Sequence, residues 1–301
     1  MSARFEFIDA EKAVRDEFGC VKYTVVKMCE WLEVSTSGFY EWLGRPLSAT
    51  AQRREWLKVL VEKAFADSDE TYGYRRVHAE LIRWGEACTE DLVRGLMREL
   101  GLVACQPRPW RHCLTDAGPC GPIPDLVERD FTAAAPGLKM VGDITYIPTW
   151  EGWLFLATVL DCHTKGVVGW AMGDNYRTPL ISAAIDMAAR NHVIAAGAVF
   201  HSDRGSNYTS VDFAATLERY GIRQSVGRTG IYYDNAMAES FFAVLKTERV
   251  HRTVYPTREH ARRDVAQYIE IRYNTRRLHS GLGYRTPREV HDEYLNRNSA
   301  V

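Results

Sequence analysis

Three acidic residues lie at positions in the sequence where an unpaired carboxylate would be unfavourable. Asp143 lies in the alternating segment "VGDITYI", Asp203 opens a glycine-containing turn in "HSDRGSNYTS", and Glu239 lies in "YYDNAMAESFFAVLKTE". A charged side chain in a core-like strand is costly unless it is paired. Two carboxylates at one sheet edge repel each other unless a cation lies between them. Asp143 and Asp203 therefore predict a divalent-metal site.

The segment that carries Glu239 predicts an amphipathic helix from about residue 235 to 250. At ~100° per residue, one stripe of this helix is apolar. The stripe consists of Met237, Phe241, Val244 and Leu245. Asn235, Glu239 and Lys246 fall together on the opposite side. The helix is therefore expected to cover the sheet with one face and to present these three polar residues with the other.

The carboxylates need a scaffold that joins distant segments. After residue 137, strand and helix patterns follow one another. The expected strands are 139–148, 153–161, 165–172, 198–200 and 222–226, and the expected helices are 179–192, 213–221 and 235–250. This order predicts an α/β fold, with a mixed five-stranded sheet, helices on both faces and the arrangement of a ribonuclease H-like core. Pairing of the first and fourth strands would bring Asp143 beside Asp203.

The composition is that of an ordinary globular protein. The 301 residues are 46% hydrophobic and 26% charged, and the formal net charge is −1. This balance excludes a uniformly basic nucleic-acid binder but allows local basic patches. From Lys246 onward, 12 Lys and Arg face 7 Asp and Glu, a net charge of +5. No apolar run approaches ~18 residues and the N-terminus lacks a signal-peptide pattern, so we expect a cytoplasmic protein without a membrane partner.

Two helix-turn-helix patterns precede the expected core, at residues 23–43 and 72–102. Four arginines lie on or near the polar faces of the second pattern: Arg75, Arg76, Arg94 and Arg98. The pattern alone leaves two interpretations equally open. The helices either bind DNA through these arginines or pack on each other and leave the arginines solvated.

The distribution of proline divides the chain. Six of the 11 prolines lie between Cys105 and Gly137, a composition typical of an extended linker. Five parts are expected: a helical helix-turn-helix-like region at 1–48, a second such region at 49–104, the linker at 105–137, the catalytic core at 138–250 and a basic helical tail at 251–301.

Four segments together resemble the DDE transposases of the retroviral-integrase superfamily, in particular the OrfB product of the insertion sequence 3 family. They are "GDITYI", "HSDRGSNYTS", "DNAMAESFFAVLKTE" and "YNTRRLHSGLGYRTPREV". The resemblance runs from about Val21 to Tyr294. Its most specific part is the spacing of the acids, with 35 residues between Asp203 and Glu239 and a lysine seven residues after Glu239.

The resemblance implies a DNA transposase. Asp143, Asp203 and Glu239 would be its catalytic and metal-binding residues. Two Mg²⁺ ions, replaceable by Mn²⁺, would support in-line displacement at phosphorus. Water would nick the end of the insertion sequence, and the freed 3′-OH would attack a second phosphodiester, with no covalent protein–DNA intermediate.

The expected partner is DNA, both the terminal inverted repeats and the target. DNA contacts are expected from Lys246, Asn235, Arg75, Arg76, Arg94, Arg98, Arg276 and Arg277. Lys246 would hold a phosphate as a point charge, although an ordinary solvated lysine fits its position equally well. The resemblance further implies homo-oligomers on DNA and allows a frameshift fusion with the product of an upstream reading frame.

Two other functions share parts of this pattern. A ribonuclease H-like nuclease without strand transfer would carry the acids but would need no end-recognition helices before the core. A DNA-binding regulator with an inert core would have lost an acid, and all three acids are present.

Overall fold

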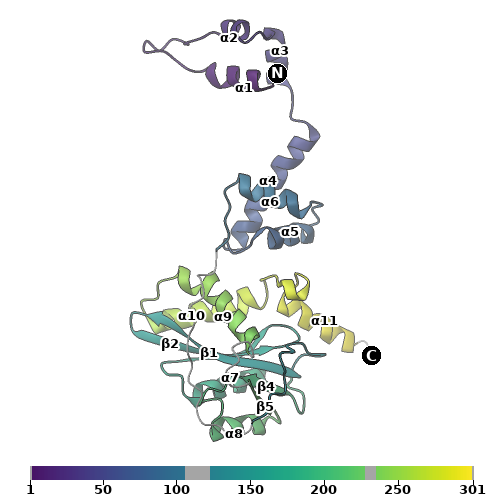
Figure 1. The fold of residues 1–301 in the computed structure, drawn as a ribbon, viewed down its shortest axis with the longest axis vertical. Coiled ribbons are helices and arrows are strands. Elements are labelled where there is room, and N and C mark those ends of the chain that lie inside the picture. Colours follow the sequence, from purple (N-terminus) through teal and green to yellow (C-terminus); the bar gives the residue numbers. More distant parts are fainter. Residues whose placement is uncertain (1, 106–122, 228–234, 300–301) are drawn as a thin grey trace. The chain divides into compact units, whose positions relative to one another are not determined.

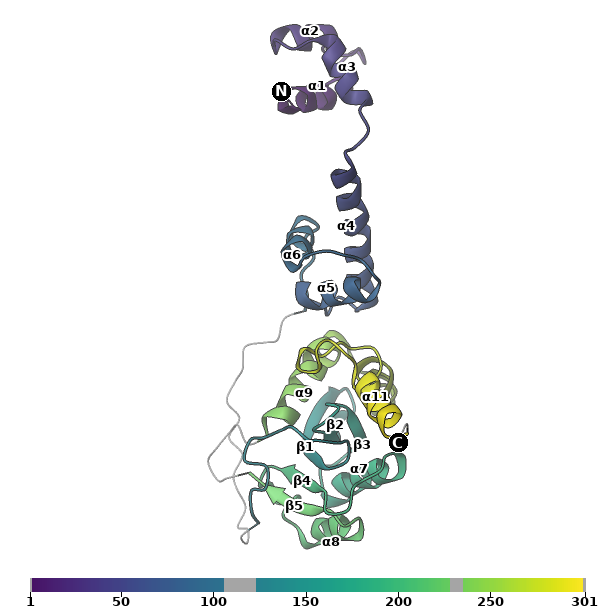
Figure 2. The same cartoon turned by 90° about the vertical axis from the view of Figure 1, so that its right-hand side faces the viewer.

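The computed structural model describes residues 2–105, 123–227 and 235–299 (Figures 1 and 2). The chain forms two compact units, Met1–Leu60 and Val61–Val301. None of the helices in the described ranges is both long enough and apolar enough to cross a membrane. The five-part division made from the sequence stays a prediction, and residues 106–122 of its linker lie outside the described ranges.

The first unit contains a capped helix-turn-helix. Its helices are α1 (Ser2–Glu11), α2 (Val25–Trp31), α3 (Thr36–Gly44) and the first part of α4 (Ala49–Asp67). The hydroxyl of Thr24 accepts a hydrogen bond from the N–H of Lys27, and that of Ser35 accepts one from Gly38, so both helices of the pair begin at a side-chain cap. The unit's small core consists of Phe5, Ile8, Met28, Cys29 and Phe39.

In the second unit, the last part of α4 is followed by two strongly amphipathic helices, α5 (Tyr74–Arg83) and α6 (Glu90–Glu99). Thr89 caps α6 through the N–H of Leu92. The buried side chains of the pair are Val77, Leu81, Val93, Leu96 and Met97. The apolar period of 3.6 residues thus determines which faces meet, and Arg75, Arg94 and Arg98 stay exposed.

The predicted five-stranded mixed sheet is confirmed. Its strands are β1 (Lys139–Thr149), β2 (Gly152–Asp161), β3 (Val167–Gly173), β4 (Val199–Ser202) and β5 (Arg223–Val226). The strand order is β3-β2-β1-β4-β5. Strands β1, β2 and β3 form an antiparallel meander, while β4 pairs in parallel with both β1 and β5.

Helices cover both faces of this sheet, as Figures 1 and 2 show. On one face, α7 (Thr178–Asn191) and α8 (Val211–Arg219) bury a core around Phe200 and Phe213. On the other face, α9 (Ala236–Glu248) and α10 (Arg258–Gln267) bury a core around Phe241 and Leu245. The chain continues through a π-helical turn, Tyr268–Tyr273, and ends with α11 (Pro287–Ser299).

The pairing of β1 with β4 determines where the acids meet. The last registered pair is Val141 with His201, and Asp143 and Asp203 each lie two residues beyond it. The residue before Asp143 is Gly142, where a Cβ would lie 2.4 Å from the ring of Phe200 and 2.8 Å from the carbonyl oxygen of Thr158. Only glycine allows this close approach. Gly142 therefore lets β1 pack tightly against Phe200 immediately before Asp143.

Candidate active site

Asp143 lies in β1 just beyond the segment that pairs with β4. Its Oδ1 accepts a hydrogen bond from the N–H of Ile144 at 2.7 Å. Burial and the charge of Asp203 raise the pKa of Asp143 to about 8; the charge of Glu239 adds to the rise, and that of Lys246 opposes it. The ionised form of Asp143 is therefore disfavoured here, and an added positive charge would stabilise it.

Asp203 directly follows β4, and a tight turn orients it. Its Oδ1 accepts a hydrogen bond from the N–H of Gly205 at 2.9 Å. A Cβ at position 205 would lie 3.0 Å from the same oxygen, so glycine leaves room for the carboxylate. Burial raises the pKa of Asp203. The turn that follows the fourth strand thus presents this acid toward the one in β1.

Glu239 lies in the first turn of α9, on the exposed side of the helix. Partial loss of hydration, and then the charge of Asp203, raise its pKa. The helix is held in place from its other side, because Ala238, Phe241, Phe242 and Leu245 are buried. The apolar stripe predicted from the sequence is therefore broader than expected, and Glu239 faces away from it.

The three acids come from three separate elements. The charges of Asp203 and Glu239 contribute to the raised pKa of Asp143, and the charge of Asp203 contributes to that of Glu239. Over the described ranges, no three His, Cys, Asp or Glu side chains lie close enough to form a finished metal cluster. The donor set nevertheless fits a hard divalent cation, since it offers only carboxylate oxygens. The mutual repulsion of the acids also indicates that they suit a cation, because a bound cation would relieve it.

Tyr208 is a residue of this site that sequence reasoning missed. It is 3% exposed and packs against Phe200 and Phe213, with ring centroids 6.1 and 5.5 Å away. Burial, and then the charges of Asp143 and Asp203, raise its pKa well above the usual range. Tyr208 therefore forms the apolar support beneath the acids. Its position in "SNYTS", inside a polar turn, carried no periodic signal of burial.

Asn235 and Lys246 were both expected to contact DNA. The Nδ2 of Asn235 donates a hydrogen bond to the carbonyl oxygen of Gly142 at 3.1 Å, which fastens the start of α9 to β1. Lys246 lies two turns after Glu239, with its Nζ 4.9 Å from the ring centroid of Tyr146. Lys246 is thus on the acid side of α9, as the helical wheel predicted, whereas Asn235 is buried and has a positioning role.

The six arginines expected to contact DNA fall into two groups. Four are exposed: Arg75, Arg94, Arg98 and Arg276. The guanidinium carbons of Arg75 and Arg94 lie 5.6 and 5.9 Å from the ring centroid of Tyr74. Arg277, by contrast, is 3% exposed and pairs with Glu248, and Arg76 contacts the same carboxylate at 3.4 Å. Arg277 is therefore buried in an ion pair and Arg76, with a side chain 27% exposed, contacts the same carboxylate, so neither belongs to the exposed group.

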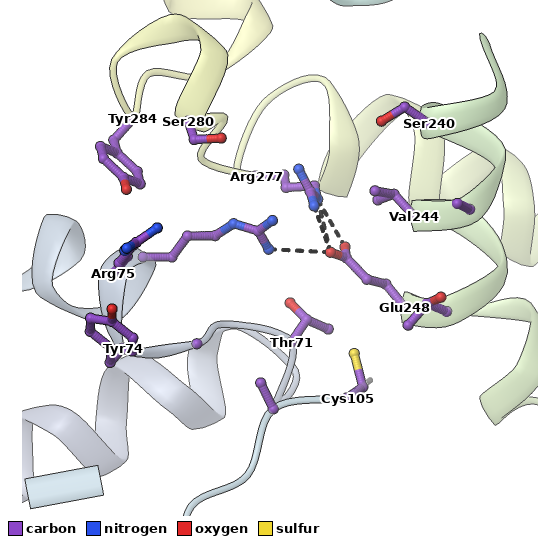
Figure 3. Close-up of a pocket in the computed structure, with 15 residues that line it drawn as sticks. Thr71, Tyr74, Arg75, Cys105, Ser240, Val244, Glu248, Arg277, Ser280 and Tyr284 are labelled. Atoms are coloured by element: carbon purple, nitrogen blue, oxygen red, sulfur yellow. Dashed lines mark hydrogen bonds and ion pairs between the residues drawn. The ribbon is translucent and has the colours of Figure 1, made fainter. Parts of the chain in front are cut away.

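A cavity of about 680 Å³ lies next to Glu248 rather than at the three acids (Figure 3). Its lining comes from α5 and the residues before it, from the segment after α6, from α9 and from residues 277–284. Arg277 donates to both oxygens of Glu248, at 2.8 and 3.0 Å, and the hydroxyl of Tyr268 donates at 2.8 Å. Burial would raise the pKa of Glu248, but these hydrogen bonds and the charge of Arg277 lower it instead.

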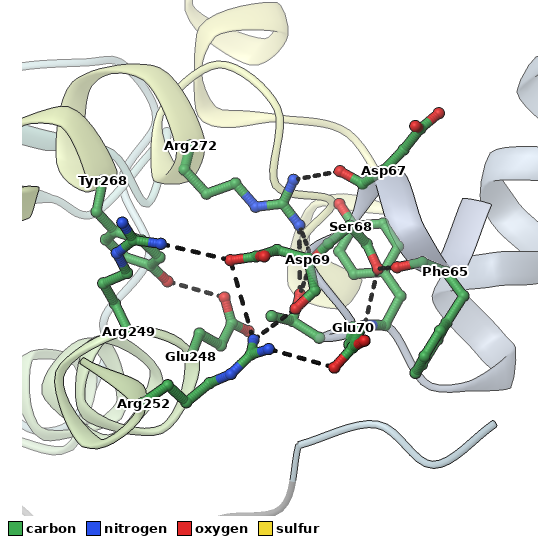
Figure 4. A network of polar contacts seen from close by, with 12 residues as sticks. Phe65, Asp67, Ser68, Asp69, Glu70, Glu248, Arg249, Arg252, Tyr268 and Arg272 are labelled. Atoms are coloured by element: carbon green, nitrogen blue, oxygen red, sulfur yellow. Dashed lines mark hydrogen bonds and ion pairs between the residues drawn. The ribbon is translucent and has the colours of Figure 1, made fainter. Parts of the chain in front are cut away.

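A second set of arginines binds the turn between α4 and α5 (Figure 4). Arg252 contacts the carbonyl oxygen of Asp69 and the carboxylate of Glu70, and Arg249 contacts the carboxylate of Asp69 at 3.5 Å. Arg272 donates to the carbonyl oxygen of Asp67 at 3.0 Å. These contacts tie the α5–α6 pair to the C-terminal segment within the second unit.

Family models match most of the chain. The integrase core domain matches residues 133–231 and, through a second model of that description, residues 220–287. An HTH-like domain matches residues 52–110. The matches cover both the segment that carries the acids and the helices that carry the exposed arginines.

Insertion-sequence proteins are similar over nearly the full chain. The insertion element IS600 uncharacterized 31 kDa protein of Shigella sonnei is 37% identical over 267 residues, which is 89% of this chain and 98% of that protein. Transposase InsF for insertion sequence IS3A of Escherichia coli (strain K12) is 36% identical over 276 residues, 91% of this chain and 96% of that protein. Among solved structures, the HTLV-2 integrase catalytic core domain in complex with magnesium aligns at 15% identity and a TM-score of 0.41, over 52% of this chain and 98% of that one.

Proposed function

The chain belongs to the IS3 family of transposases and is a DNA transposase with an integrase core domain, and from this premise we propose that Asp143, Asp203 and Glu239 are its catalytic, metal-binding residues. The observation that carries the proposal is the parallel pairing of β1 with β4: Asp143 and Asp203 each follow the last registered pair by two residues, and Glu239 lies in the first turn of α9. The raised pKa of Asp143, to which both other acids contribute, supports it. Groups with strongly shifted pKa values that converge in this way are typical of active sites.

The proposed reaction consists of two displacements at phosphorus. In the first, the oxygen of water bonds to phosphorus at the end of the element and the bond to the 3′ oxygen breaks, which frees a 3′-OH. In the second, that hydroxyl bonds to a phosphorus of the target DNA and another 3′ oxygen leaves. Two divalent cations, Mg²⁺ or in its place Mn²⁺, bound by the three acids would activate the attacking oxygen and stabilise the leaving one.

The chain's own residues hold the acids in position. The N–H of Ile144 orients Asp143, and the N–H of Gly205 orients Asp203. Asn235 ties the first turn of α9, and with it Glu239, to the backbone beside Asp143. These three hydrogen bonds orient the acids before the phosphate arrives, so less reorganisation is needed in the reaction.

We propose that DNA is bound by four exposed arginines, Arg75, Arg94, Arg98 and Arg276, and by the half-buried Lys246. Their separation along the chain suits a protein that grips a terminal inverted repeat at one place and acts on it at another. Assembly of several copies on DNA, and action in the bacterial cytosol, are part of the same proposal. A frameshift fusion with an upstream product would add contacts to this set.

The Asp203→Asn variant tests the catalytic assignment. We expect strand cleavage and joining to fall by more than about 100-fold, because several kcal/mol of metal-dependent stabilisation are lost, while binding of the terminal repeat persists. Asp212→Asn is the matched control, since Asp212 is an exposed acid in the neighbouring α8. Retained cleavage by Asp203→Asn would disprove the assignment. Cleavage without joining in the unaltered protein would instead indicate a nuclease, and DNA binding without cleavage would indicate a regulator.

A further inference from the structure

A row of exposed aromatic side chains begins at Tyr146, three residues after Asp143 on β1. Tyr146 and Trp153 are each 51% exposed, and Tyr176 is 57% exposed. Large aromatic side chains at the surface usually mark a binding site when they lie together, because each ring offers a broad apolar contact. The proposed reaction assigns no role to these three residues.

The sheet holds the row together. Tyr146 in β1 pairs across the strands with Phe155 in β2, and Trp153 lies two residues before Phe155 on the same face. The rings of Tyr146 and Trp153 meet edge to face, with centroids 4.8 Å apart and planes at 73°. The ring of Phe155 lies 5.3 Å from that of Tyr176. Because Tyr146 and Trp153 stand on paired strands and their rings touch, the two rings form one platform.

Lys246 connects this platform to the acids. Its Nζ lies 4.9 Å from the centroid of Tyr146, and its positive charge acts on Asp143, three residues before Tyr146 on the same strand. A cation and two aromatic rings therefore lie side by side at the edge of the acid site. This combination suits a ligand that carries a negative charge next to a flat aromatic group.

A nucleotide that has left its base pair has those two features. Its phosphate complements the charge of Lys246, and its base has the planar face that exposed aromatic rings bind without regard to sequence. A duplex base pair cannot use the rings in this way, because both faces of its bases are already stacked. The neighbouring cation and acids also argue against an apolar protein partner. Such a partner would bury these charges in the core of the interface, where charged residues are unfavourable.

We propose that Tyr146 and Trp153 form a stacking platform for the base of an unpaired nucleotide next to the scissile phosphate. Lys246 holds the phosphate of that nucleotide. The inference rests on the proposed function of the three acids, since it places the base beside their substrate. It adds to that function a requirement that the DNA end be opened locally. The platform holds the opened strand and so favours the orientation in which the phosphate meets the acids.

Fluorescence tests the platform without requiring catalysis. The full chain carrying Asp203→Asn is titrated with a short single-stranded oligothymidylate that contains one 2-aminopurine. Stacking should quench the 2-aminopurine, and Tyr146→Leu in the same background should weaken binding roughly tenfold, whereas Tyr146→Phe, which keeps the ring, should change it little. Equal affinities for the Leu and Phe variants would overturn the proposal. Because cleavage is not measured, failure here is distinguishable from failure of the acid assignment.

A cleavage experiment with the unaltered acids supplies the second arm. The substrate is the terminal inverted repeat, either intact or with an abasic site in place of the base beside the scissile phosphate. Tyr146→Leu and Trp153→Leu should each lower cleavage of the intact repeat, and neither should lower cleavage of the abasic repeat further than the abasic site itself does. A loss of the same size on both substrates would show that these residues only support the fold, and would overturn the proposal.

Discussion

Two glutamates on one helix have opposite surroundings. Glu239 is in the first turn of α9, exposed, with a pKa raised by lost hydration and by Asp203. Glu248 ends the same helix, 5% exposed, with a pKa lowered, despite burial, by hydrogen bonds and charge from Arg277. At one end of the helix, three acids repel one another and the charge of Lys246 only partly offsets the raised pKa of Asp143; at the other end, Glu248 is paired with Arg277 and Arg76. The first end of α9 therefore has acids that a bound cation would stabilise. The second end has an acid whose ion pairs stabilise the fold.

The second end of α9 is also a junction within the second unit. Glu248 receives Arg277 from the C-terminal segment and Arg76 from α5. Arg249 and Arg252 follow directly and bind the turn before α5. A carboxylate buried among such partners is costly to disturb, because removal of one partner leaves the other charge buried and alone. Substitutions at the two ends of α9 should therefore have different consequences.

The largest expected effect is loss of catalysis at the first end. Glu239→Gln should lower strand cleavage by more than about 100-fold, because it removes a ligand of the proposed metal site. The same change removes repulsion from Asp203, so the melting temperature should stay the same or rise slightly. Cleavage assays and thermal unfolding of the same preparation measure both. A large fall in melting temperature would mean that Glu239 stabilises the fold, as Glu248 does, and would contradict the difference between the two ends of α9.

The next effect is loss of stability at the second end. Glu248→Ala should lower the free energy of unfolding by about 3–5 kcal/mol, because Arg277 is left buried without its partner. Urea unfolding measures the change. Glu259→Ala is the matched control: Glu259 is an exposed acid of α10 whose pair with Arg263 is on the surface, so little stability should be lost. Equal effects of the two substitutions would contradict the structural role of Glu248.

The pH dependence of stability should differ between the two ends. Asp143 has a pKa raised from 3.8 to about 8, so the metal-free folded protein holds a proton that the unfolded chain releases. Stability should fall as pH rises between about 4 and 8, by at most ~1.4 kcal/mol per pH unit. Asp143→Asn should flatten this slope, and Mg²⁺ should offset the fall. An unchanged slope in that variant would show that the raised pKa of Asp143 does not cause the pH dependence of stability.

Glu248 should act in the opposite direction and at lower pH. Its folded pKa is lowered, so its contribution is present above the unfolded value of about 4.3 and is lost as pH falls through the folded value. Unfolding followed between about pH 5 and pH 2 should therefore show a loss that Glu248→Ala no longer shows. Parallel pH profiles for the variant and the unaltered protein would contradict the lowered pKa.

The smallest effect concerns Lys246, on the acid side of α9. Lys246→Ala should weaken cleavage without lowering the melting temperature, and should reduce the slope of log affinity against log salt by roughly one unit through loss of a phosphate contact. Lys246→Arg keeps the charge and is the control for it. If cleavage and the salt slope are both unchanged in Lys246→Ala, Lys246 is an ordinary surface lysine, and the functional part of the helix ends at Glu239.

The sequence by itself determined the order of the elements and the place of the acids on them. Apolar alternation located β1, and the 3.6-residue period located α9 and placed Glu239 and Lys246 on its polar side. The start of α6 is a local feature of the same kind, because the hydroxyl of Thr89 caps it through the N–H of Leu92, three residues away. These signals depend on neighbours within a few residues along the chain, so a single sequence is enough to reveal them.

Only the tertiary structure decided which polar residues stay exposed. Arg276 and Arg277 are adjacent in the sequence, yet one is exposed and the other is buried against Glu248, 29 residues earlier. Asn235 points to Gly142 across 93 residues, and Tyr208 supports both aspartates from inside a polar turn. No local period encodes such pairs, because a buried charge or amide is tolerated only where a distant segment supplies its partner, and folding is what brings that partner near.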